Sequence, residues 1–243
     1  MEQLVRGVRR ELRENADEEK RRGEQAYFKE GVTCLGVGMA IVHRIARERF
    51  ADLKGMTKGE VFGLCKELWR AGSLEETIVA CDWSYFVRRQ YAAGDIRVFA
   101  GWVGKYVNNW ASCDTLCNHS VGELLEMYPE RVVDLKVWAR SKNRWLRRGA
   151  AVSLIIPAKK GKFPADVLQI ADILLADPDD LVQKGYGWML KVASQAHREE
   201  IFAFVMRNRS VMPRTALRYA IEKMPGGLKR RAMARQEMKE VKG

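Results

Sequence analysis

The chain has 243 residues, and its 47% of hydrophobic residues suffice for a substantial core. Lysine and arginine exceed aspartate and glutamate by 12, which favours a polyanionic partner, nucleic acid or an acidic membrane surface, over a charge that only aids solubility. The apolar runs are too short to span a bilayer, and the charged N-terminal segment lacks the apolar core of a secretory signal. We therefore expect a cytoplasmic protein without membrane spans, whose five cysteines are reduced and buried.

Helical periodicity runs through nearly every segment, and the alternation typical of β-strands is rare. In chain order the patterns predict helices over 2–14, 17–30, 37–50, 57–71, 74–91, 95–107, 109–127, 130–140, 144–156, 164–176, 179–195, 198–208 and 213–224. Thr57 with Glu60, and Ser73 with Glu76, fit the capping-box pattern that begins a helix. Prolines 129, 164, 178 and 213 stand between these runs or in their first turns, where proline is tolerated.

Helix pairs recur from residue 57 onward at about 35–45 residues, the spacing of HEAT-type repeats, without a repeated motif. We predict an all-α protein: a superhelical, C-shaped array of antiparallel HEAT-like helix pairs with a concave basic face. An ordinary globular helical bundle is the alternative. We expect one domain over 1–225 and a basic, loosely ordered C-terminal tail over 226–243, which begins at a Gly-Gly break.

Basic residues gather in the stretch 140–165, which contains no aspartate or glutamate. They are Arg140, Lys142, Arg144, Arg147, Arg148, Lys159, Lys160 and Lys162. An uncompensated cluster at a helix and its following loop suits phosphate contacts, although charge runs are usually solvated faces. The adjacent arginines in "NRWLRRGAAVSLIIP" stand beside a tryptophan and an apolar stripe, so at least one of them is expected close to a packed interface.

Two further stretches carry aromatic residues that could serve a site. In "VQKGYGWMLKVASQ", Gly185 and Gly187 predict a close approach by another surface, and Trp188 is either a core aromatic or a site residue. In "NNWASCDTLC", Trp110 and Asp114 lie four residues apart, which on a helix stacks them on one face. A flat aromatic beside a carboxylate is either ordinary packing or a place to hold a cation.

Taken together, five stretches make the chain resemble the AlkD-type DNA alkylation repair glycosylases, from about residue 1 to 225. They are "QAYFKEGVTCLGV", "CKELW", "WASCD", "WLRRGAA" and "YGWMLK". The resemblance implies a C-shaped array of HEAT-like helix pairs and a monofunctional enzyme. It would hydrolyse the N-glycosidic bond of 3-methyladenine or 7-methylguanine in double-stranded DNA.

The resemblance also implies roles for single residues. Asp114 falls on the catalytic carboxylate, and Trp110 and Trp188 on the two aromatic walls of the lesion site. Arg148 falls on a phosphate-contacting arginine and Tyr27 on a tyrosine near the DNA backbone. We add Arg147, Lys159, Lys160 and Lys162 from the basic cluster as DNA-binding residues. The sequence departs from the family pattern at Asn109 and Ala111, the positions where relatives carry a second tryptophan and an acidic residue. The resemblance therefore does not define the lesion preference or the rate of excision.

The implied chemistry is physically consistent with these residues. An N3- or N7-alkylpurine is a cation, and its glycosidic bond breaks through an oxocarbenium-like sugar. Indole faces attract such charge by about 1–2 kcal/mol each when desolvated. A carboxylate near C1′ stabilises the charge more strongly and orients the attacking water. Because the alkylated base already leaves readily, one aspartate suffices without a partner acid.

Other functions find less support in the sequence. Cys113, Cys117 and His119 have no second ligand pair, so no zinc site, other metal or cofactor is expected. The mixed charges of the N-terminal helix argue against a membrane surface. The principal alternative is a non-catalytic HEAT-repeat protein that binds distorted or branched DNA. A protein–protein scaffold leaves the net charge unexplained. We expect a monomer.

Overall fold

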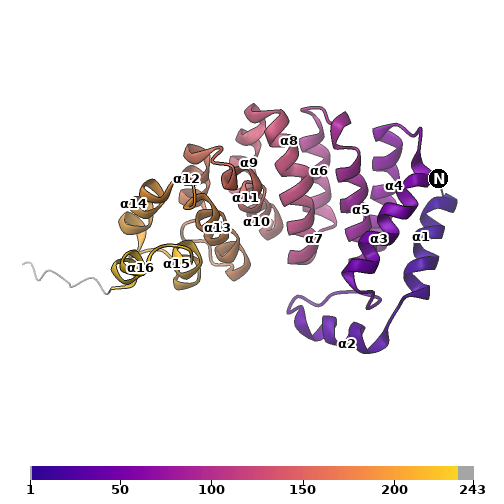
Figure 1. Ribbon diagram of the computed structural model, residues 1–243, viewed down its shortest axis with the longest axis horizontal. Helices are drawn as coiled ribbons and strands as arrows, with labels where there is room; N and C mark the ends of the chain where they lie inside the picture. Colours follow the sequence, from indigo (N-terminus) through magenta and orange to yellow (C-terminus); the bar gives the residue numbers. More distant parts are fainter. Residues whose placement is uncertain (1, 235–243) are drawn as a thin grey trace, which may run out of the picture. The chain divides into compact units, whose positions relative to one another are not determined.

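The computed structural model describes residues 2–234, and this part of the chain is built from helices without any β-strand (Figure 1). The predicted all-α class, built from antiparallel helix pairs, is confirmed. The helices group into two compact units that divide between Asp134 and Leu135, and each unit is described by itself. Within the described residues, no helix is both long and apolar enough to cross a membrane.

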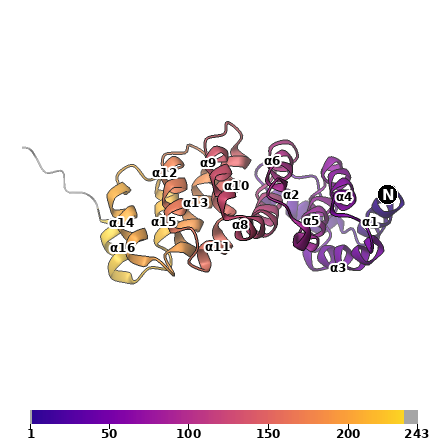
Figure 2. The ribbon, with the colours of Figure 1, turned by 90° about the horizontal axis from the view of Figure 1, so that it is seen from above.

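The first unit contains nine helices or parts of them among its described residues. They are α1 (Glu2–Glu14), α2 (Glu18–Tyr27), α3 (Met39–Phe50), α4 (Lys58–Ala71), α5 (Leu74–Phe86), α6 (Asp95–Lys105), α7 (Trp110–Thr115), α8 (Gly122–Met127) and the start of α9 (Val132–Trp138). Helix α5 packs against both α3 and α4. Helices α4 and α6 lie on one side of this unit and α3 on the other (Figure 2).

The second unit is organised around one long helix, α13. Its helices after α9 are α10 (Arg144–Val152), α11 (Ile155–Lys159), α12 (Pro164–Ile173), α13 (Asp180–Ala193), α14 (Arg198–Asn208), α15 (Arg214–Ile221) and α16 (Gly226–Met233). Helix α13 packs against α10, α11, α12 and α15. Tyr186, Met189 and Leu190 of α13 are fully buried, so this helix supplies much of the unit's core.

The predicted helix starts are largely confirmed. Thr57 accepts a hydrogen bond from the amide of Glu60, and the Glu60 carboxylate accepts one from the amide of Thr57, which completes a capping box. Ser73 caps α5 in the same way, but the carboxylate of Glu76 binds the Ser73 hydroxyl and Arg9 instead. The five cysteines are free and buried, as the sequence predicts.

The helix predicted over 144–156 is wrong in its second half. Helix α10 ends at Val152, and a separate short helix, α11, follows from Ile155. The cause is Pro157, which has no amide hydrogen to donate to the carbonyl of Ser153 and whose ring would clash with that carbonyl. The break turns the chain before the lysines at 159 and 160.

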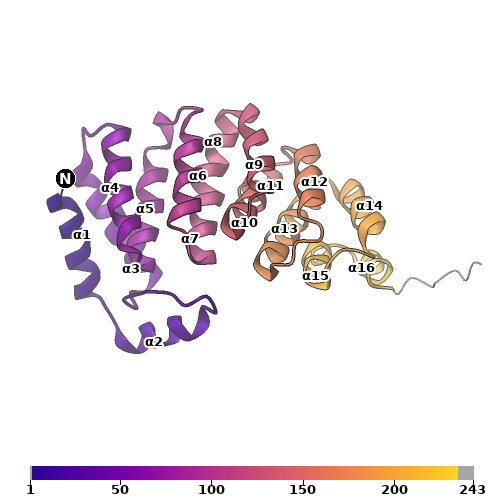
Figure 3. The same ribbon diagram turned by 180° about the vertical axis from the view of Figure 1, so that it is seen from behind.

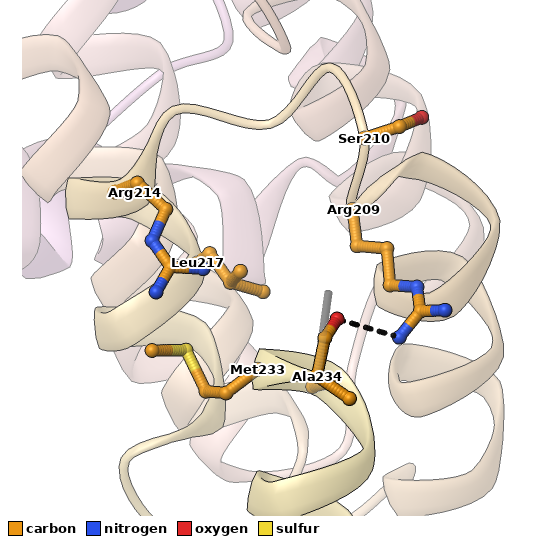
Figure 4. A pocket seen from close by; sticks show the side chains of 7 residues that line it. Arg209, Ser210, Arg214, Leu217, Met233 and Ala234 are labelled. Carbon is orange, nitrogen blue, oxygen red and sulfur yellow. Dashed lines mark hydrogen bonds between the residues drawn. The ribbon is translucent and has the colours of Figure 1, made fainter. Parts of the chain in front are cut away.

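Part of the predicted tail is helical. Residues 226–233 form α16, which packs against α14 and α15 and buries Ala232, while residues 235–243 lie outside the described part. A cavity of about 450 Å³ lies among these helices, lined among others by Arg214, Leu217 and Met233. Arg209 donates to the carbonyl of Ala234 at 3.4 Å (Figure 4). It also donates to the carbonyl of Arg231 at 2.7 Å and so caps the end of α16. The boundary at 225 stays a prediction.

Candidate functional site

Trp110 and Asp114 lie on the short helix α7, which begins at the tryptophan. The helix begins there because Asn109 is extended and its side chain accepts a hydrogen bond from the amide of Ser112 at 2.9 Å. The four-residue spacing places the indole and the carboxylate on the same side of α7, one turn apart. Both residues are half-buried. The pair therefore combines a fixed backbone with access to solvent.

Directly after this pair the helix widens. Residues Leu116–Val121 form a π-helical turn before α8 begins at Gly122, within the segment predicted as one regular helix. A π turn holds one more residue than an α turn, so the faces on either side of it change phase. Leu116, Cys117 and Val121 are fully buried, and the core on this side is continuous through the turn. The turn itself contains no proline or glycine, and Gly122 stands directly after it, at the start of α8.

The indole of Trp110 packs in a cluster of three aromatic rings. Phe28 stacks on it with ring centres 5.3 Å apart and an interplanar angle of 21°. Tyr27 meets it edge-on at 6.1 Å. Phe28 is buried, whereas Tyr27 is 70% exposed. The predicted tyrosine thus stands beside the predicted tryptophan. Sequence reasoning missed Phe28, although its place next to Tyr27 was the available signal.

Phe28 opens the connection between α2 and α3, and a buried carboxylate holds this connection in place. Glu75, at the start of α5, is fully buried and accepts hydrogen bonds from the amides of Leu35 (2.8 Å) and Val37 (3.1 Å). The amide of Leu74 donates to the carbonyl of Thr33 at 2.8 Å. These bonds tie residues 33–37 to α5 and so anchor the second half of the connection that Phe28 opens.

The same connection runs back alongside α2, where glycine is required (Figure 3). Gly36 has a φ of +79°, and a Cβ at this position would lie 2.1 Å from the carbonyl oxygen of Asp17 and 2.6 Å from the amide nitrogen of Arg21. Asp17 caps α2 by accepting from the amides of Glu19 and Lys20. Helix α2, the connection and α5 therefore form one support behind Tyr27 and Phe28.

Two titratable groups are enclosed in this support. Burial raises the pKa of the Glu24 carboxyl; a hydrogen bond with Cys34 acts in the opposite direction, and the charge of Glu75 raises the pKa further. Burial, together with Glu24, also raises the pKa of the Cys34 thiol to about 11. A carboxyl with a raised pKa stabilises the fold while it is protonated, so the support should weaken as the pH rises through the raised pKa of Glu24.

In the second unit, Arg148 and Trp188 belong to the packed helices α10 and α13. Arg148 is only 5% exposed, and its guanidinium donates to the backbone carbonyl of Leu181 in the first turn of α13. A Cβ added to Gly185 would lie 3.4 Å from Cγ of Arg148, which is van der Waals contact, so the arginine packs directly against α13 at this glycine. Trp188 follows on α13 and is half-buried. The predicted arginine at a packed interface is therefore Arg148.

The close approach predicted at Gly187 is confirmed. A Cβ there would lie 2.7 Å from Cβ of Tyr219 and 2.9 Å from the carbonyl oxygen of Ala216, both on α15. Helices α13 and α15 are thus in contact through their backbones at this point. The glycine costs helix propensity, and the tight packing of the two helices offsets that cost.

Replacing Gly187 by alanine is expected to lower the free energy of unfolding by about 1–3 kcal/mol, because overpacking outweighs the gain in helix propensity. Urea denaturation measures the change. Gly63 in α4 is the matched control, since a Cβ there meets no heavy atom within 4 Å. Gly63→Ala should raise stability by up to about 1 kcal/mol. Equal effects at the two positions would contradict the packing between α13 and α15.

The basic stretch 140–165 is not uncompensated, and that expectation is wrong. Arg147 binds both oxygens of Asp177, at 2.6 and 3.3 Å, and donates to the carbonyls of Ser141 and Lys142. Arg144 pairs with Asp179 at 2.7 Å. The two aspartates come from a loop about 30 residues away, so counting the charges within 140–165 does not include them. All three guanidinium nitrogens of Arg147 thus donate within the protein.

The three lysines of the stretch are differently placed. Lys159 ends α11, Lys160 follows it, and Lys162 comes after Gly161, whose φ of +76° turns the chain. All three side chains are exposed. They lie in the second unit with Arg148 and Trp188, whereas Trp110, Asp114 and Tyr27 lie in the first. Within the described residues, no three histidine, cysteine or carboxylate side chains are grouped so as to hold a metal ion.

Comparison with known proteins agrees with this architecture. The family model of the DNA alkylation repair enzymes matches residues 8–224. A solved structure described as a predicted DNA alkylation repair enzyme from Enterococcus faecalis is similar to this chain with a TM-score of 0.79 and 14% sequence identity. The similarity covers 87% of this chain and 98% of that one. No curated protein sequence matches.

Proposed function

Because the chain belongs to the family of DNA alkylation repair enzymes, we propose that it is a monofunctional DNA glycosylase. It hydrolyses the N-glycosidic bond of cationic N3- and N7-alkylpurines, such as 3-methyladenine and 7-methylguanine, in double-stranded DNA. The observation that carries this proposal is the pair on α7. Trp110 and Asp114 lie one turn apart on one side of the helix, both keep access to solvent, and Phe28 holds the indole in place.

The carboxylate of Asp114 would act on the sugar. When the bond between C1′ and the base nitrogen breaks, the electron pair leaves with the cationic base, which departs neutral. The positive charge moves to C1′ and the ring oxygen, and an adjacent carboxylate stabilises it in the transition state. A water molecule oriented by the same carboxylate bonds to C1′ and gives up a proton, as in glycoside hydrolysis. No proton has to be given to the leaving base.

Trp110 would attract the positive charge of the lesion and of the developing oxocarbenium ion. An indole is the best of the aromatic faces for this purpose. Stacking by Phe28 covers one face of the ring, and the residue nevertheless stays half-exposed. Because the buried Phe28 already stacks on it, the indole need not be ordered when DNA binds. We propose Trp188, half-buried on α13, as the second aromatic wall.

Trp110→Leu should slow excision of 7-methylguanine by roughly 5- to 30-fold, the value of about one cation–π interaction. Leucine keeps apolar bulk and loses the ring quadrupole. Phe28→Leu, which leaves the indole itself intact, should slow excision less. Single-turnover release of the base measures both rates. Excision at the wild-type rate by the Trp110 variant would remove the indole from the mechanism.

The DNA backbone would be held by exposed cations and by Tyr27. The exposed lysines at 159, 160 and 162 favour phosphate contacts, and Tyr27 is a further proposed contact. Arg148 is buried and donates to the carbonyl of Leu181, and only the resemblance to the family assigns it a phosphate contact. The sequence predicts Arg147 as a DNA contact, but its nitrogens donate to Asp177 and two carbonyls, so we propose that it supports this surface instead. A monomeric state and a cytoplasmic location without a cofactor belong to the same proposal.

Replacing all three lysines by alanine should weaken binding to intact and alkylated DNA alike, because phosphate contacts carry no lesion information. The slope of log K against log[salt] should fall by about one unit for each lost contact. The triple arginine variant retains the charge and should bind as the wild type does. An unchanged salt slope in the alanine variant would show that these three lysines do not contact DNA.

The alternative is a protein that binds distorted or branched DNA without cutting it. Incubation with duplex DNA that carries 7-methylguanine or 3-methyladenine, followed by assay of free base, separates the two functions. The glycosylase releases free base in proportion to time and enzyme. Tight binding without released base would favour the alternative. The half-exposed carboxylate one turn from the tryptophan favours the enzyme, since binding alone has no need of a negative charge facing DNA.

A further inference from the structure

A groove lies between α4 and α6 in the first unit, apart from the α7 pair. Its cavity is about 420 Å³ and is lined by residues of these two helices. Both helices lie on one side of the unit (Figure 2). Phe62 and Trp102, which are 8% and 5% exposed, form its floor, and their ring centres lie 5.2 Å apart. The floor is thus apolar and firmly packed.

The groove exists because each helix carries a glycine where a side chain would fill it. Gly63 on α4 and Gly101 on α6 both line the cavity, and a Cβ built on either meets no heavy atom within 4 Å. Both glycines lie inside helices, where each lowers helix stability relative to alanine. Unlike Gly187, neither is required by a close contact with another helix. The open space itself is what the two glycines provide.

Positive charge surrounds the opening without compensation. Lys66, Arg97 and Lys105 line the groove and are exposed. In the part of the chain that the structure describes, none of the three forms an ion pair with a carboxylate. The contrast is Lys58 on the same helix α4, whose ammonium group binds Asp95 on α6 at 2.7 Å. The ammonium group of Lys105 lies 5.5 Å from the ring centre of Tyr106, a contact that does not neutralise its charge. The rim is therefore a set of exposed cations without carboxylate partners among the described residues.

We propose that this groove docks an acidic segment of a partner protein. A bulky apolar side chain of the partner enters between Gly63 and Gly101, and flanking carboxylates pair with Lys66, Arg97 and Lys105. The apolar floor and the cationic rim of the groove then both contact the partner, as in other grooves that bind a peptide segment. Duplex DNA matches only the rim, because its outer surface offers phosphates and sugars but no apolar side chain for the floor.

The test uses a fluorescent peptide in which one phenylalanine is flanked by glutamates, with the full chain as receptor. The peptide should bind in low salt. It should lose most of its affinity when phenylalanine is replaced by serine or when the glutamates are replaced by glutamine. Gly63→Leu with Gly101→Leu fills the groove. This variant should keep or raise the melting temperature, excise 7-methylguanine as the wild type does, and bind the peptide at least about tenfold more weakly.

Charge reversal provides the second arm. Lys66→Glu with Lys105→Glu should weaken peptide binding and invert its salt dependence, because the remaining repulsion between carboxylates is screened by salt. Failure of the wild type to bind the peptide, or equal binding by the filled variant, would overturn the proposal. If charge reversal instead weakens binding of duplex DNA while filling the groove does not, the rim is a phosphate surface and the proposed protein partner is wrong. Absence of excision in the wild type as well as in the variants would concern the proposed function only.

Discussion

Asp114→Asn is expected to slow the release of 7-methylguanine by on the order of 100-fold or more while DNA affinity changes little. Asparagine has nearly the same shape and keeps α7 capped by Asn109, so the backbone beside Trp110 should not move. What is lost is a negative charge that acts on the oxocarbenium-like sugar. This charge stabilises the transition state, so its loss should leave the affinity for intact DNA unchanged.

The measurement is single-turnover excision with enzyme in excess, with affinity taken from the same duplex. Asp172→Asn is the matched control, because Asp172 is an exposed carboxylate of α12 in the second unit. It should excise at the wild-type rate. If Asp114→Asn also excises at the wild-type rate, Asp114 is not the catalytic carboxylate. If both variants lose DNA binding together, the loss reflects charge or folding in general.

Cationic lesions are expected to be released, and neutral ones of similar size are expected not to be. 7-Methylguanine carries a formal positive charge and departs as a neutral base, whereas uracil and 8-oxoguanine need a proton in order to leave. The proposed pair offers a carboxylate and an indole, neither of which donates that proton. Every 1.36 kcal/mol of missing assistance slows the step about tenfold, so release of neutral bases should fall below detection.

The comparison is made on duplexes of one sequence in which only the damaged base differs. 8-Oxoguanine is similar in size to 7-methylguanine, so a difference between their rates of release reflects the charge of the base and not its size. Release of uracil or 8-oxoguanine at a rate near that of 7-methylguanine would show that the leaving base is protonated. The charge-stabilising roles of Trp110 and Asp114 would then have to be abandoned.

Features set by neighbouring residues could be predicted from the sequence. The helix caps at Thr57 and Ser73 could be predicted because a capping motif involves only four consecutive residues. The close approach at Gly187 could be predicted because a glycine inside a helix lowers helix stability, which indicates that a larger side chain would not fit there. The placement of Trp110 and Asp114 on one side of α7 followed from helix geometry alone.

Features that depend on residues far apart in the chain could not be predicted. Glu75 holds the connection 28–38 from about 40 residues away, and nothing near Phe28 signals that anchor. Asp177 neutralises Arg147 across a similar gap, and a local charge count therefore misjudged the cluster. The π turn after Asp114 depends on how the buried residues around it pack. The break before Pro157 is different, since proline's missing amide made it predictable.

Mass analysis of both products from one duplex that contains 7-methylguanine tests the central claim most directly. The glycosylase should yield free 7-methylguanine with its methyl group attached, and an equal amount of uncut strand that carries an abasic site. Asp114→Asn should yield neither in the same time. A strand in which the methyl group is gone and guanine remains would show repair by dealkylation, and an unchanged strand would show binding alone. Either result would contradict hydrolysis at Trp110 and Asp114.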